Sequence, residues 1–190
     1  MTHVFIAIWK DWKRYTGLHT RMNPLLFLAV LFRNPGMHFS VMYRFERYFL
    51  YESNILFALL GALLYPGYFI LTYYIYSIDI SPRVKIGTGL YVHNRGISFT
   101  ENAVAGDYLT LDGPLTLGRK GVGADNGAPS LGDHVTVFAG ARIVGSVRIG
   151  NQAYIGANAV VVKDVPSHCI VAGVPAKIIR KLNADEESRV

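Results

Sequence analysis

The chain has little of several residue types that mark other protein classes. It contains a single cysteine, Cys169, in 190 residues, which excludes an intramolecular disulfide framework and a multi-cysteine zinc site. Its 8 prolines and 19 glycines follow no Gly-X-Y period, so the chain is not collagen-like. Charged residues make up only 17% of the chain and hydrophobic residues 51%, which is typical of a folded protein with one core and not of a disordered chain.

Motifs for nucleotides and nucleic acids are also absent. No Walker-type loop is present and no Gly-x-Gly-x-x-Gly follows a predicted strand, which argues against nucleotide hydrolysis and a Rossmann cofactor. The formal net charge is +6, but there is no basic block with interleaved aromatic residues, no zinc-finger motif and no RNP-like motif. We therefore expect no nucleic-acid partner, although a basic chain can contact anionic lipids or glycans.

One long segment, residues 55–78, has no charged side chain. It is long enough to cross a bilayer, but Pro66-Gly67 in its middle would kink or break a helix, and its five tyrosines suit a membrane interface better than a lipid core. We therefore expect a helical hairpin that is buried between subunits or lies on a membrane face. No signal peptide is predicted, so we expect a cytoplasmic protein, peripheral at the inner membrane face.

From residue 80 onward, small aliphatic side chains recur at every sixth position. Six residues fit neither the 3.6-residue period of a helix nor the two-residue period of an ordinary strand. They fit a solenoid in which each flat face is a short strand, an aliphatic side chain points inward and glycine relieves the backbone at corners. Three hexapeptides would close one triangular coil, and stacked coils would form the core. The positions that carry the period are Ile80, Ile86, Ile97, Ala103, Leu109, Leu115, Leu131, Val137, Ile143, Ile149, Ile155 and Val161.

Two breaks in this period indicate where function lies. The spacing from Ile86 to Ile97 is eleven residues, one short of two repeats, and this slip surrounds His93. A spacing of sixteen residues after Leu115 predicts that residues 118–130 leave the solenoid as a loop. Loops that leave a rigid scaffold are common places for binding sites.

Four stretches of the repeat region carry a family resemblance: IGTGLYVHNRG, AVAGDYLTLDGPLTLG, GAPSLGDHVTVFAGARIVG and IVAGVPAKIIRK. They resemble the hexapeptide-repeat acyltransferases, in particular the serine acetyltransferase family, and within it the colanic-acid-type exopolysaccharide O-acetyltransferases. The resemblance covers about residues 23–181. It implies a left-handed parallel β-helix, a homotrimer, acetyl-CoA as donor and active sites between adjacent subunits.

The predicted fold class is therefore an all-β solenoid, a left-handed parallel β-helix preceded by an α-helical region and followed by a short C-terminal helix. We assign residues 1–78 to an apolar helical N-terminal region. We assign residues 79–190 to the acetyltransferase domain, which includes the expelled loop 118–130 and the C-terminal helix.

Acetyl transfer to a hydroxyl needs a base for the hydroxyl proton and a donor for the oxyanion. Of the six histidines, His93 lies at the slip in the period, and it aligns with the catalytic histidine of the resembling family. We predict that His93 is the general base, with a structural histidine at a coil corner as the alternative. Asp107, Asp112 and Asp125 are candidates to orient it, and we carry Asp112 forward as the second catalytic residue.

The resemblance implies that acetyl-CoA lies along the C-terminal coils. Small residues there would let the pantetheine arm approach the backbone, and an N–H near Ala139 or Gly140 would hold the thioester carbonyl. Basic residues near the end would contact the phosphates, and a solvated basic face is the alternative. No metal is expected. The predicted cofactor-binding residues are Gly118, Ala139, Gly140, Ala157, Gly173, Val174, Pro175, Lys177 and Arg180.

Departures from the family pattern concern the acceptor. Serine acetyltransferases carry an aspartate directly before this histidine and an Arg-His pair in the expelled loop, whereas this chain has Val92 and the stretch Asn-Gly-Ala-Pro at 126–129. Without charged partners for the ammonium and carboxylate of serine, a neutral sugar hydroxyl is favoured. The predicted acceptor-binding residues are Asn94, Arg95, Asp125 and Asn126.

The leading hypothesis is an acetyl-CoA-dependent O-acetyltransferase that acts on a sugar hydroxyl of an exopolysaccharide or capsule precursor, as a homotrimer with peripheral membrane contact. The alternatives are a serine O-acetyltransferase of cysteine biosynthesis and a non-catalytic trimeric scaffold, which the missing second histidine motivates. A γ-type carbonic anhydrase ranks last because it needs three converging histidines, and only His93 and His134 fall within the repeats proper.

Overall fold

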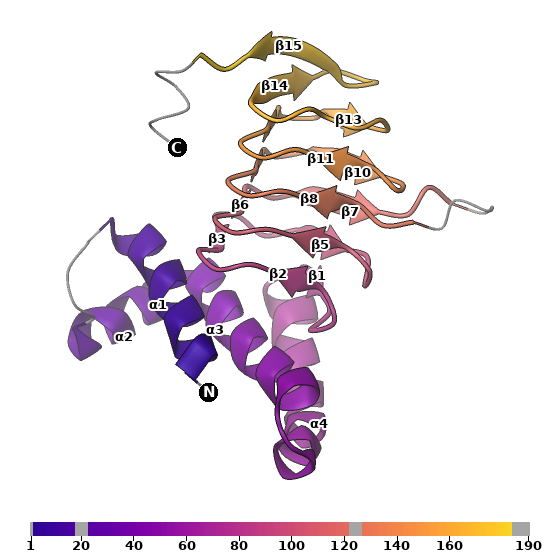
Figure 1. The fold of residues 1–190 in the computed structure, drawn as a ribbon. Helices are drawn as coiled ribbons and strands as arrows, with labels where there is room; N and C mark the ends of the chain where they lie inside the picture. Colours follow the sequence, from indigo (N-terminus) through magenta and orange to yellow (C-terminus); the bar gives the residue numbers. More distant parts are fainter. Residues whose placement is uncertain (1, 18–22, 122–126, 184–190) are drawn as a thin grey trace.

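The chain folds as a helical base from which a β-solenoid rises (Figure 1). The structure is a computed structural model that describes residues 2–17, 23–121 and 127–183. The base and the solenoid follow one another along the sequence without mixing, because the helices come from the apolar N-terminal region and all the strands from the repeat region.

Polar caps and prolines set the starts of several helices. The side chain of Asn23 accepts hydrogen bonds from the N–H groups of Leu25 and Leu26, and Pro24 follows at the first helical position, where its missing N–H costs nothing. Asn54 caps a later helix in the same way by accepting from the N–H of Phe57. The described helical segments are α1 (Thr2–Thr16), α2 (Pro24–Arg33), α3 (Pro35–Arg47), the π-helical η1 (Tyr48–Glu52), α4 (Ile55–Phe69) and the π-helical η2 (Ile70–Ile75).

The uncharged segment forms one continuous helix, so the hairpin expected within it is wrong. α4 and η2 run from Ile55 to Ile75 through Pro66. Proline removes one backbone hydrogen bond, but here the helix continues and widens four residues later into η2, where the N–H of Tyr76 bonds the carbonyl of Leu71 five residues back.

A helical hairpin does exist, but its two arms are η1 and α4. The ring of Phe49 stacks on that of Phe57 at 6.0 Å between centroids and 10° between planes. Gly61 allows the close approach, because a Cβ on it would lie 2.8 Å from the Cβ of Phe49. The turn of the hairpin therefore falls between η1 and α4.

The solenoid has three sheets, and from β1 to β13 each paired strand lies beside the strand three further along the chain, which is one coil away, in parallel. At the end of the chain, β14 pairs parallel with β12, and β15 pairs antiparallel with β14. We name the sheets by their first strands. The β1 sheet has the order β1-β4-β7-β10-β13, the β2 sheet β2-β5-β8-β11, and the β3 sheet β3-β6-β9-β12-β14-β15. The strands are β1 (Ile78–Ile80), β2 (Lys85–Ile86), β3 (Tyr91–Val92), β4 (Ile97–Phe99), β5 (Val104–Ala105), β6 (Thr110–Leu111), β7 (Leu115–Gly118), β8 (Ser130–Leu131), β9 (Thr136–Val137), β10 (Arg142–Val144), β11 (Arg148–Ile149), β12 (Tyr154–Ile155), β13 (Val160–Val161), β14 (Cys169–Ala172) and β15 (Lys177–Lys181).

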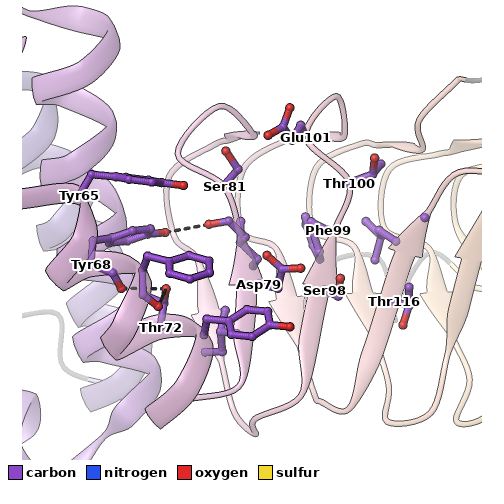
Figure 2. Close-up of a pocket in the computed structure, with 16 residues that line it drawn as sticks. Tyr65, Tyr68, Thr72, Asp79, Ser81, Ser98, Phe99, Thr100, Glu101 and Thr116 are labelled. Atoms are coloured by element: carbon purple, nitrogen blue, oxygen red, sulfur yellow. Dashed lines mark hydrogen bonds between the residues drawn. The ribbon is translucent and has the colours of Figure 1, made fainter. Parts of the chain in front are cut away.

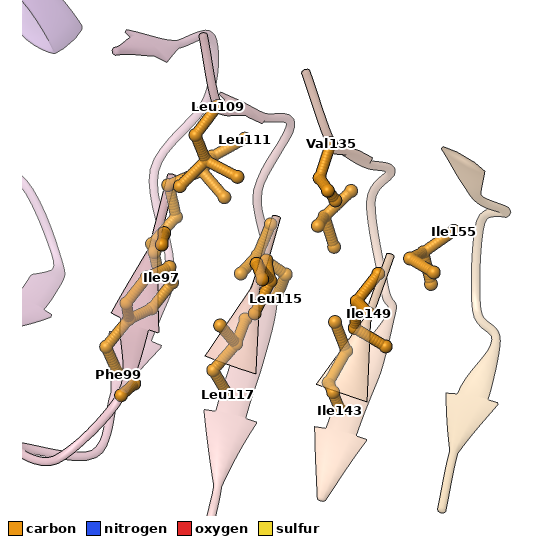
Figure 3. Close-up of a cluster of buried hydrophobic side chains, with 14 of the residues drawn as sticks. Ile97, Phe99, Leu109, Leu111, Leu115, Leu117, Val135, Ile143, Ile149 and Ile155 are labelled. Carbon is orange, nitrogen blue, oxygen red and sulfur yellow. The ribbon is translucent and has the colours of Figure 1, made fainter. Parts of the chain in front are cut away.

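The core of the solenoid confirms the six-residue period. Every position predicted to point inward is buried. Most of these positions have a second buried partner two residues away, as in Ile97 with Phe99 and Leu115 with Leu117 (Figure 3). Each face therefore contributes up to two inward side chains per coil, and the stacking of both series from coil to coil buries the apolar surface.

The slip in the period is a longer corner at His93. Ile86 is the second inward residue of its strand and Ile97 the first of its own, so the eleven-residue spacing joins two different series. Three residues separate Ile86 from the next inward position, Leu90, whereas four separate Val92 from Ile97. The single extra residue makes the corner that carries His93 project further from the core.

The two remaining predicted features differ in outcome. β7 ends at Gly118 and β8 begins at Ser130, and the described residues between them form neither helix nor strand, in agreement with a loop.

The predicted C-terminal helix is wrong for the described residues, because β15 is a strand that pairs antiparallel with β14. This pairing covers the open edge of the last described coil, whose N–H and C=O groups would otherwise be unpaired.

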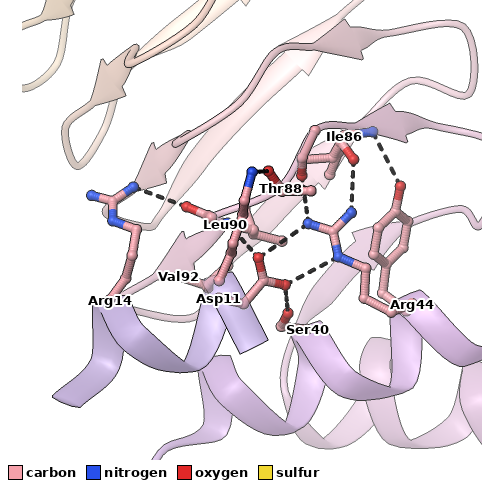
Figure 4. Close-up of polar contacts among 12 residues, drawn as sticks. Asp11, Arg14, Ser40, Arg44, Ile86, Thr88, Leu90 and Val92 are labelled. Atoms are coloured by element: carbon pink, nitrogen blue, oxygen red, sulfur yellow. Dashed lines mark hydrogen bonds and ion pairs between the residues drawn. The ribbon is translucent and has the colours of Figure 1, made fainter. Parts of the chain in front are cut away.

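The helical base is fastened to the first coil by a buried ion pair (Figure 4). Asp11 accepts hydrogen bonds from the guanidinium of Arg44 at 3.0 Å, from the N–H of Leu90 at 2.8 Å and from the hydroxyl of Ser40. Arg44 in turn donates to the carbonyl of Ile86 at 2.7 Å. The pair is fully enclosed, since Asp11 is 0% exposed and Arg44 7%.

Three tyrosine hydroxyls complete this cap by bonding backbone groups of the first coil. Burial raises the pKa of each of them above its usual value, so they remain protonated donors. The bonded groups are Tyr15 with Val92, Tyr43 with Val84 and Ile86, and Tyr68 with Ile80.

Removing one partner of the buried pair should destabilise the whole protein. We expect Asp11→Ala to lower the free energy of unfolding by about 3–5 kcal/mol, because the charge of Arg44 is left buried without a partner. Chemical denaturation followed by circular dichroism measures this. The control is Arg83→Ala, which removes a pair with Glu101 whose side chains are 61% and 52% exposed and should cost less than about 1 kcal/mol. Equal losses in the two variants would contradict the role of the cap.

Candidate functional site

One edge of the solenoid gathers most of the predicted site residues. Along it the chain turns from the β3 sheet into the β1 sheet, and we call it the His93 edge. Its corners are hydrogen-bonded to one another: the N–H of Asn158 donates to the carbonyl of Ala139 at 2.9 Å, and that of Gly140 to the carbonyl of Pro114. From the first coil upward, the corners are residues 93–96, 112–114, 138–141 and 156–159. Above them lies the turn 173–176, which joins β14 to β15 within the β3 sheet and accepts a hydrogen bond at the carbonyl of Gly173 from the N–H of Val160 at 3.0 Å.

His93 lies at the foot of this edge in a pocket of about 380 Å³. Its side chain is exposed, and its ring stands edge-on to that of Tyr91 at 6.1 Å between centroids. Within the described residues, no hydrogen bond is formed by either ring nitrogen. An imidazole so placed can accept a proton from a bound hydroxyl. The pocket is lined by Pro35, Gly36, Ile78, Val92, His93, Asn94 and Arg95.

The start of α3 forms one wall of the His93 pocket, and the sequence analysis did not find it. Gly36 lies so close to β3 that an added Cβ would be 2.0 Å from the carbonyl oxygen of Val92 and 2.7 Å from the hydroxyl of Tyr15. Its only sequence signal is Asn34-Pro35, which predicts a helix start but not the strand beside it. Val92 points into the core, so the position before the histidine adds no polar group.

Asp112 lies on the same edge one coil above His93, but its partner is another residue. Its carboxylate accepts a hydrogen bond from the side-chain amide of Asn94. It therefore fixes Asn94, the residue next to the imidazole, and it reaches His93 only through that neighbour. Asp107 lies at a different corner, where it accepts from the N–H and hydroxyl of Thr88 at 2.6 and 3.1 Å.

The other predicted acceptor residues divide between described and undescribed parts of the chain. Arg95 is exposed at the rim of the His93 pocket and donates to the carbonyl of Ile75 at 3.4 Å, at the end of η2. Asp125 and Asn126 lie outside the described residues. The described part of the pocket therefore has one cationic side chain and no acidic one.

Two coils above His93, the corner at Ala139 and Gly140 has small side chains that leave its backbone N–H groups accessible. Gly140 has φ +79, and a Cβ on it would lie 1.9 Å from the side-chain oxygen of Asn158, so only glycine fits there. The N–H of Gly140 is bonded to Pro114, whereas the N–H of Ala139 has no acceptor among the described residues. At about 4.8 Å per coil, Ala139 lies about 10 Å along the edge from His93.

The remaining predicted cofactor residues continue the edge, with one exception. Ala157 is exposed on the fourth coil, and Gly173, Val174 and Pro175 are exposed on the fifth, about 19 Å from His93 by coil spacing. Lys177 and Arg180 are exposed on β15, opposite Ala172 and Ile170 of β14. Gly118 is the exception, because it ends β7 at a different corner. In the ranges 2–17, 23–121 and 127–183, no cluster of three or more potential metal ligands occurs.

Comparison with known proteins shows what this chain resembles in sequence and in fold. A family model described as "Bacterial transferase hexapeptide (six repeats)" matches residues 128–163. A serine acetyltransferase of Mycobacterium tuberculosis is 35% identical over 153 residues, which are 80% of this chain and 64% of the relative. The crystal structure of the Neisseria gonorrhoeae serine acetyltransferase superposes with a TM-score of 0.77 at 28% identity, over 99% of this chain and 70% of that one.

The chain is similar in sequence and in fold to the serine acetyltransferases, and part of its repeat region matches the hexapeptide transferase model. A third relative, from Synechococcus elongatus, is 38% identical over 104 residues, which are 54% of this chain and 43% of the relative. This chain thus spans between 43% and 64% of the length of these two curated relatives. The resemblance to the serine acetyltransferases predicted from the four sequence stretches is confirmed, as is the parallel solenoid with its helical N-terminal region. The closer resemblance to the colanic-acid-type enzymes stays a prediction.

Two glycine-to-alanine substitutions, one at the contact of α3 with β3 and one away from it, should change the unfolding temperature in opposite directions. Gly36→Ala should lower the unfolding temperature and change the rate at which diethylpyrocarbonate modifies His93, because the new methyl group meets the backbone of Val92. Gly67→Ala is the control: nothing lies within 4 Å of the added Cβ, and alanine stabilises an exposed helix by about 0.5–1 kcal/mol. Mass spectrometry and thermal unfolding provide the readouts. An unchanged modification rate at His93 in the Gly36 variant would contradict the placement of α3.

Proposed function

We propose that this chain transfers an acetyl group from acetyl-CoA to the hydroxyl of an acceptor, with His93 as the general base. The observation that carries the proposal is the His93 edge, where an exposed imidazole stands at the foot of a column of small-residue corners. The serine acetyltransferase relatives support acetyl transfer as the reaction.

The reaction follows from the positions along the edge. A ring nitrogen of His93 takes the proton of the acceptor hydroxyl while the hydroxyl oxygen attacks the thioester carbonyl. The N–H of Ala139, which has no acceptor among the described residues, donates to the oxyanion of the tetrahedral intermediate. When the intermediate collapses, the C–S bond breaks and the CoA thiolate takes the proton from the imidazolium. The products are the acetyl ester and free CoA.

The same edge offers a place for the donor. In this proposal the pantetheine arm of acetyl-CoA runs over the corners at Ala139, Gly140, Ala157 and Gly173, where small side chains leave the backbone open. Lys177 and Arg180 then lie near the phosphate end. The edge is open on one side in the single chain, and a homotrimer in which a neighbouring subunit closes the cleft is part of the proposal.

Two acceptors have separate support. The names of the relatives support L-serine, and a structure of the Neisseria gonorrhoeae enzyme in complex with serine is 29% identical to this chain. The described residues of the His93 pocket support a neutral hydroxyl, such as a sugar hydroxyl of an exopolysaccharide or capsule precursor of the colanic-acid type. Arg95 could pair with the carboxylate of serine, but none of the described residues that line the pocket is acidic and able to pair with its ammonium group.

Replacement of the imidazole tests the proposed base. We expect His93→Ala to lower the rate of acetyl transfer about 10²–10⁴-fold, because the hydroxyl proton loses its acceptor. The rate is measured by release of the CoA thiol with L-serine and, separately, with oligosaccharides as acceptors. The control is His134→Asn at a corner of another edge, where the native ring stacks on Tyr108 at 4.7 Å. Asparagine tolerates its positive φ of 56.

Each outcome of this assay separates two of the hypotheses. Turnover with L-serine alone selects the serine acetyltransferase, and turnover with oligosaccharides alone selects the sugar acceptor. Full activity of the His93 variant would overturn the assignment of the base. If calorimetry finds that the wild-type protein does not bind acetyl-CoA, the chain is a scaffold without chemistry.

The η1–α4 hairpin supports a further proposal, that the protein lies at a membrane surface. The helix Ile55–Ile75 is long and apolar enough to cross a membrane, and only 17% of its most apolar window is buried inside the protein. Its exposed residues up to Leu64 are aliphatic, whereas exposed tyrosines appear from Tyr65 to Tyr74, nearer the solenoid. Aliphatic side chains suit hydrocarbon and tyrosines suit the headgroup layer. The hairpin projects from the end of the molecule opposite β15 (Figure 1).

Charges placed on the hairpin test the membrane contact. We expect the double variant Leu59→Glu/Leu63→Glu to stop sedimenting with vesicles of phosphatidylcholine and phosphatidylglycerol. The native leucine side chains are 62% and 76% exposed and enter the lipid in this proposal, whereas the charged side chains of glutamate would not. The control is Val162→Glu, on an exposed corner of the solenoid. Vesicle binding that survives in the double variant, or a loss of self-association in place of vesicle binding, would contradict the membrane contact.

A further inference from the structure

A second cavity lies beside the His93 pocket, between the helix α4–η2 and the β1 sheet (Figure 2). Its volume is about 440 Å³, which is in the range of sites for small molecules. We call this second cavity the groove. The groove and the His93 pocket share Ile78 as a lining residue. The two pockets therefore lie next to each other, on either side of the buried side chain of Ile78.

One wall of the groove is aromatic. Tyr65, Phe69 and Tyr73 line it from successive turns of the helix, and each is 38–45% exposed. The rings of Phe69 and Tyr73 stack nearly parallel, with 5.2 Å between centroids and 14° between planes. Partly exposed ring faces of this kind provide a flat apolar surface for the C–H face of a sugar ring.

The opposite wall is a polar ladder on the β1 sheet. Asp79, Ser98 and Thr116 occupy matching positions on β1, β4 and β7, so their side chains follow one another at about 4.8 Å. Within the described residues, none of these three side chains forms a hydrogen bond. A carboxylate accepts from two hydroxyls and each hydroxyl both donates and accepts, so the ladder matches a ligand rich in hydroxyl groups.

The charges of the groove select among ligands. Its lining includes the carboxylate of Asp79 and that of Glu101, which is paired with Arg83 at 3.1 Å, and no lysine or arginine is among the described residues that line it. This arrangement disfavours phosphates and acidic sugars. The next matching position on the β1 sheet is Arg142 of β10, so the cation-free stretch of the ladder is limited to the three strands β1, β4 and β7 that line the groove.

We propose that this groove binds a neutral oligosaccharide and directs one of its hydroxyls to His93. The aromatic wall receives the ring faces, the ladder receives the hydroxyls, and the end of the groove at Ile78 lies beside the pocket of the base. The inference rests on the proposed function, because it assigns the class of acceptor for the same acetyl transfer. In addition to the proposed membrane contact, the helix α4–η2 then forms one wall of the acceptor site.

Binding is tested separately from catalysis. Saturation-transfer NMR on the full chain is carried out with maltotetraose, cellotetraose and chitotetraose as neutral probes and with trigalacturonic acid as an acidic one. We expect at least one neutral probe to bind and trigalacturonic acid to bind more weakly. If none of the three neutral probes binds, or if the acidic probe binds most tightly, the proposal is overturned.

Two neighbouring tyrosines give a matched pair of variants. We expect Tyr73→Ala to weaken binding of the neutral probe about five- to tenfold, because it removes a ring from the groove. Tyr74→Ala, whose 69% exposed native side chain does not line the groove, should bind as the wild type does. Asp79→Asn should also weaken binding while leaving the unfolding temperature unchanged. Equal affinities of the Tyr73 and Tyr74 variants would overturn the site.

The two proposals fail in different ways. A probe that binds in the groove but receives no acetyl group would leave the carbohydrate site standing and overturn the reaction. Acetyl transfer that depends on His93 but is insensitive to Tyr73→Ala and Asp79→Asn would leave the reaction standing and overturn the groove.

Discussion

The first coil of the solenoid has no coil beneath it, and its open backbone groups are the constraint on which the structure depends. Side chains of the helical base take the place of the missing coil: Asp11 accepts from the N–H of Leu90, Arg44 donates to the carbonyl of Ile86, and Tyr15 bonds both backbone groups of Val92. The same contacts bring the start of α3 against β3, where it forms a wall of the His93 pocket. The cap and the pocket are therefore one piece of structure.

The repeat could be predicted from the sequence because each coil face must place an aliphatic side chain in a narrow core. The period located every coil from Ile80 to Val161, and its slip located the projecting corner at His93. The second inward series was missed because it mixes residue sizes, from Ala105 to Phe99. The spacing was counted from Ile86, which belongs to the second series, to Ile97, which belongs to the first. The single added residue at the corner therefore gave a spacing of eleven residues.

Features decided by tertiary contacts could not be predicted in this way. Pro66 predicts a broken helix by local rules, but the helix continues through it and widens into the π-helical η2 four residues later. The basic stretch after Pro175 was compatible with a helix, and the open edge of β14 made part of it a strand instead. Asp112 was placed on the right edge by its coil position, but its bond to Asn94 depends on side-chain directions that a repeat does not encode.

The two halves of the proposed reaction depend on different parts of the chain. The donor side of the His93 edge consists mainly of backbone and small residues, such as Ala139 and Gly140, which every coil of the repeat can supply. The acceptor side consists of larger side chains, and one of its walls comes from the helices rather than the repeat: Gly36 of α3 closes the pocket and Tyr73 of η2 lines the groove. A change in the helical base can therefore alter the acceptor while the repeat keeps the donor in place. This division accounts for a chain that keeps the solenoid of the serine acetyltransferases yet presents to its acceptor a pocket without carboxylates and a groove without cations among the described residues.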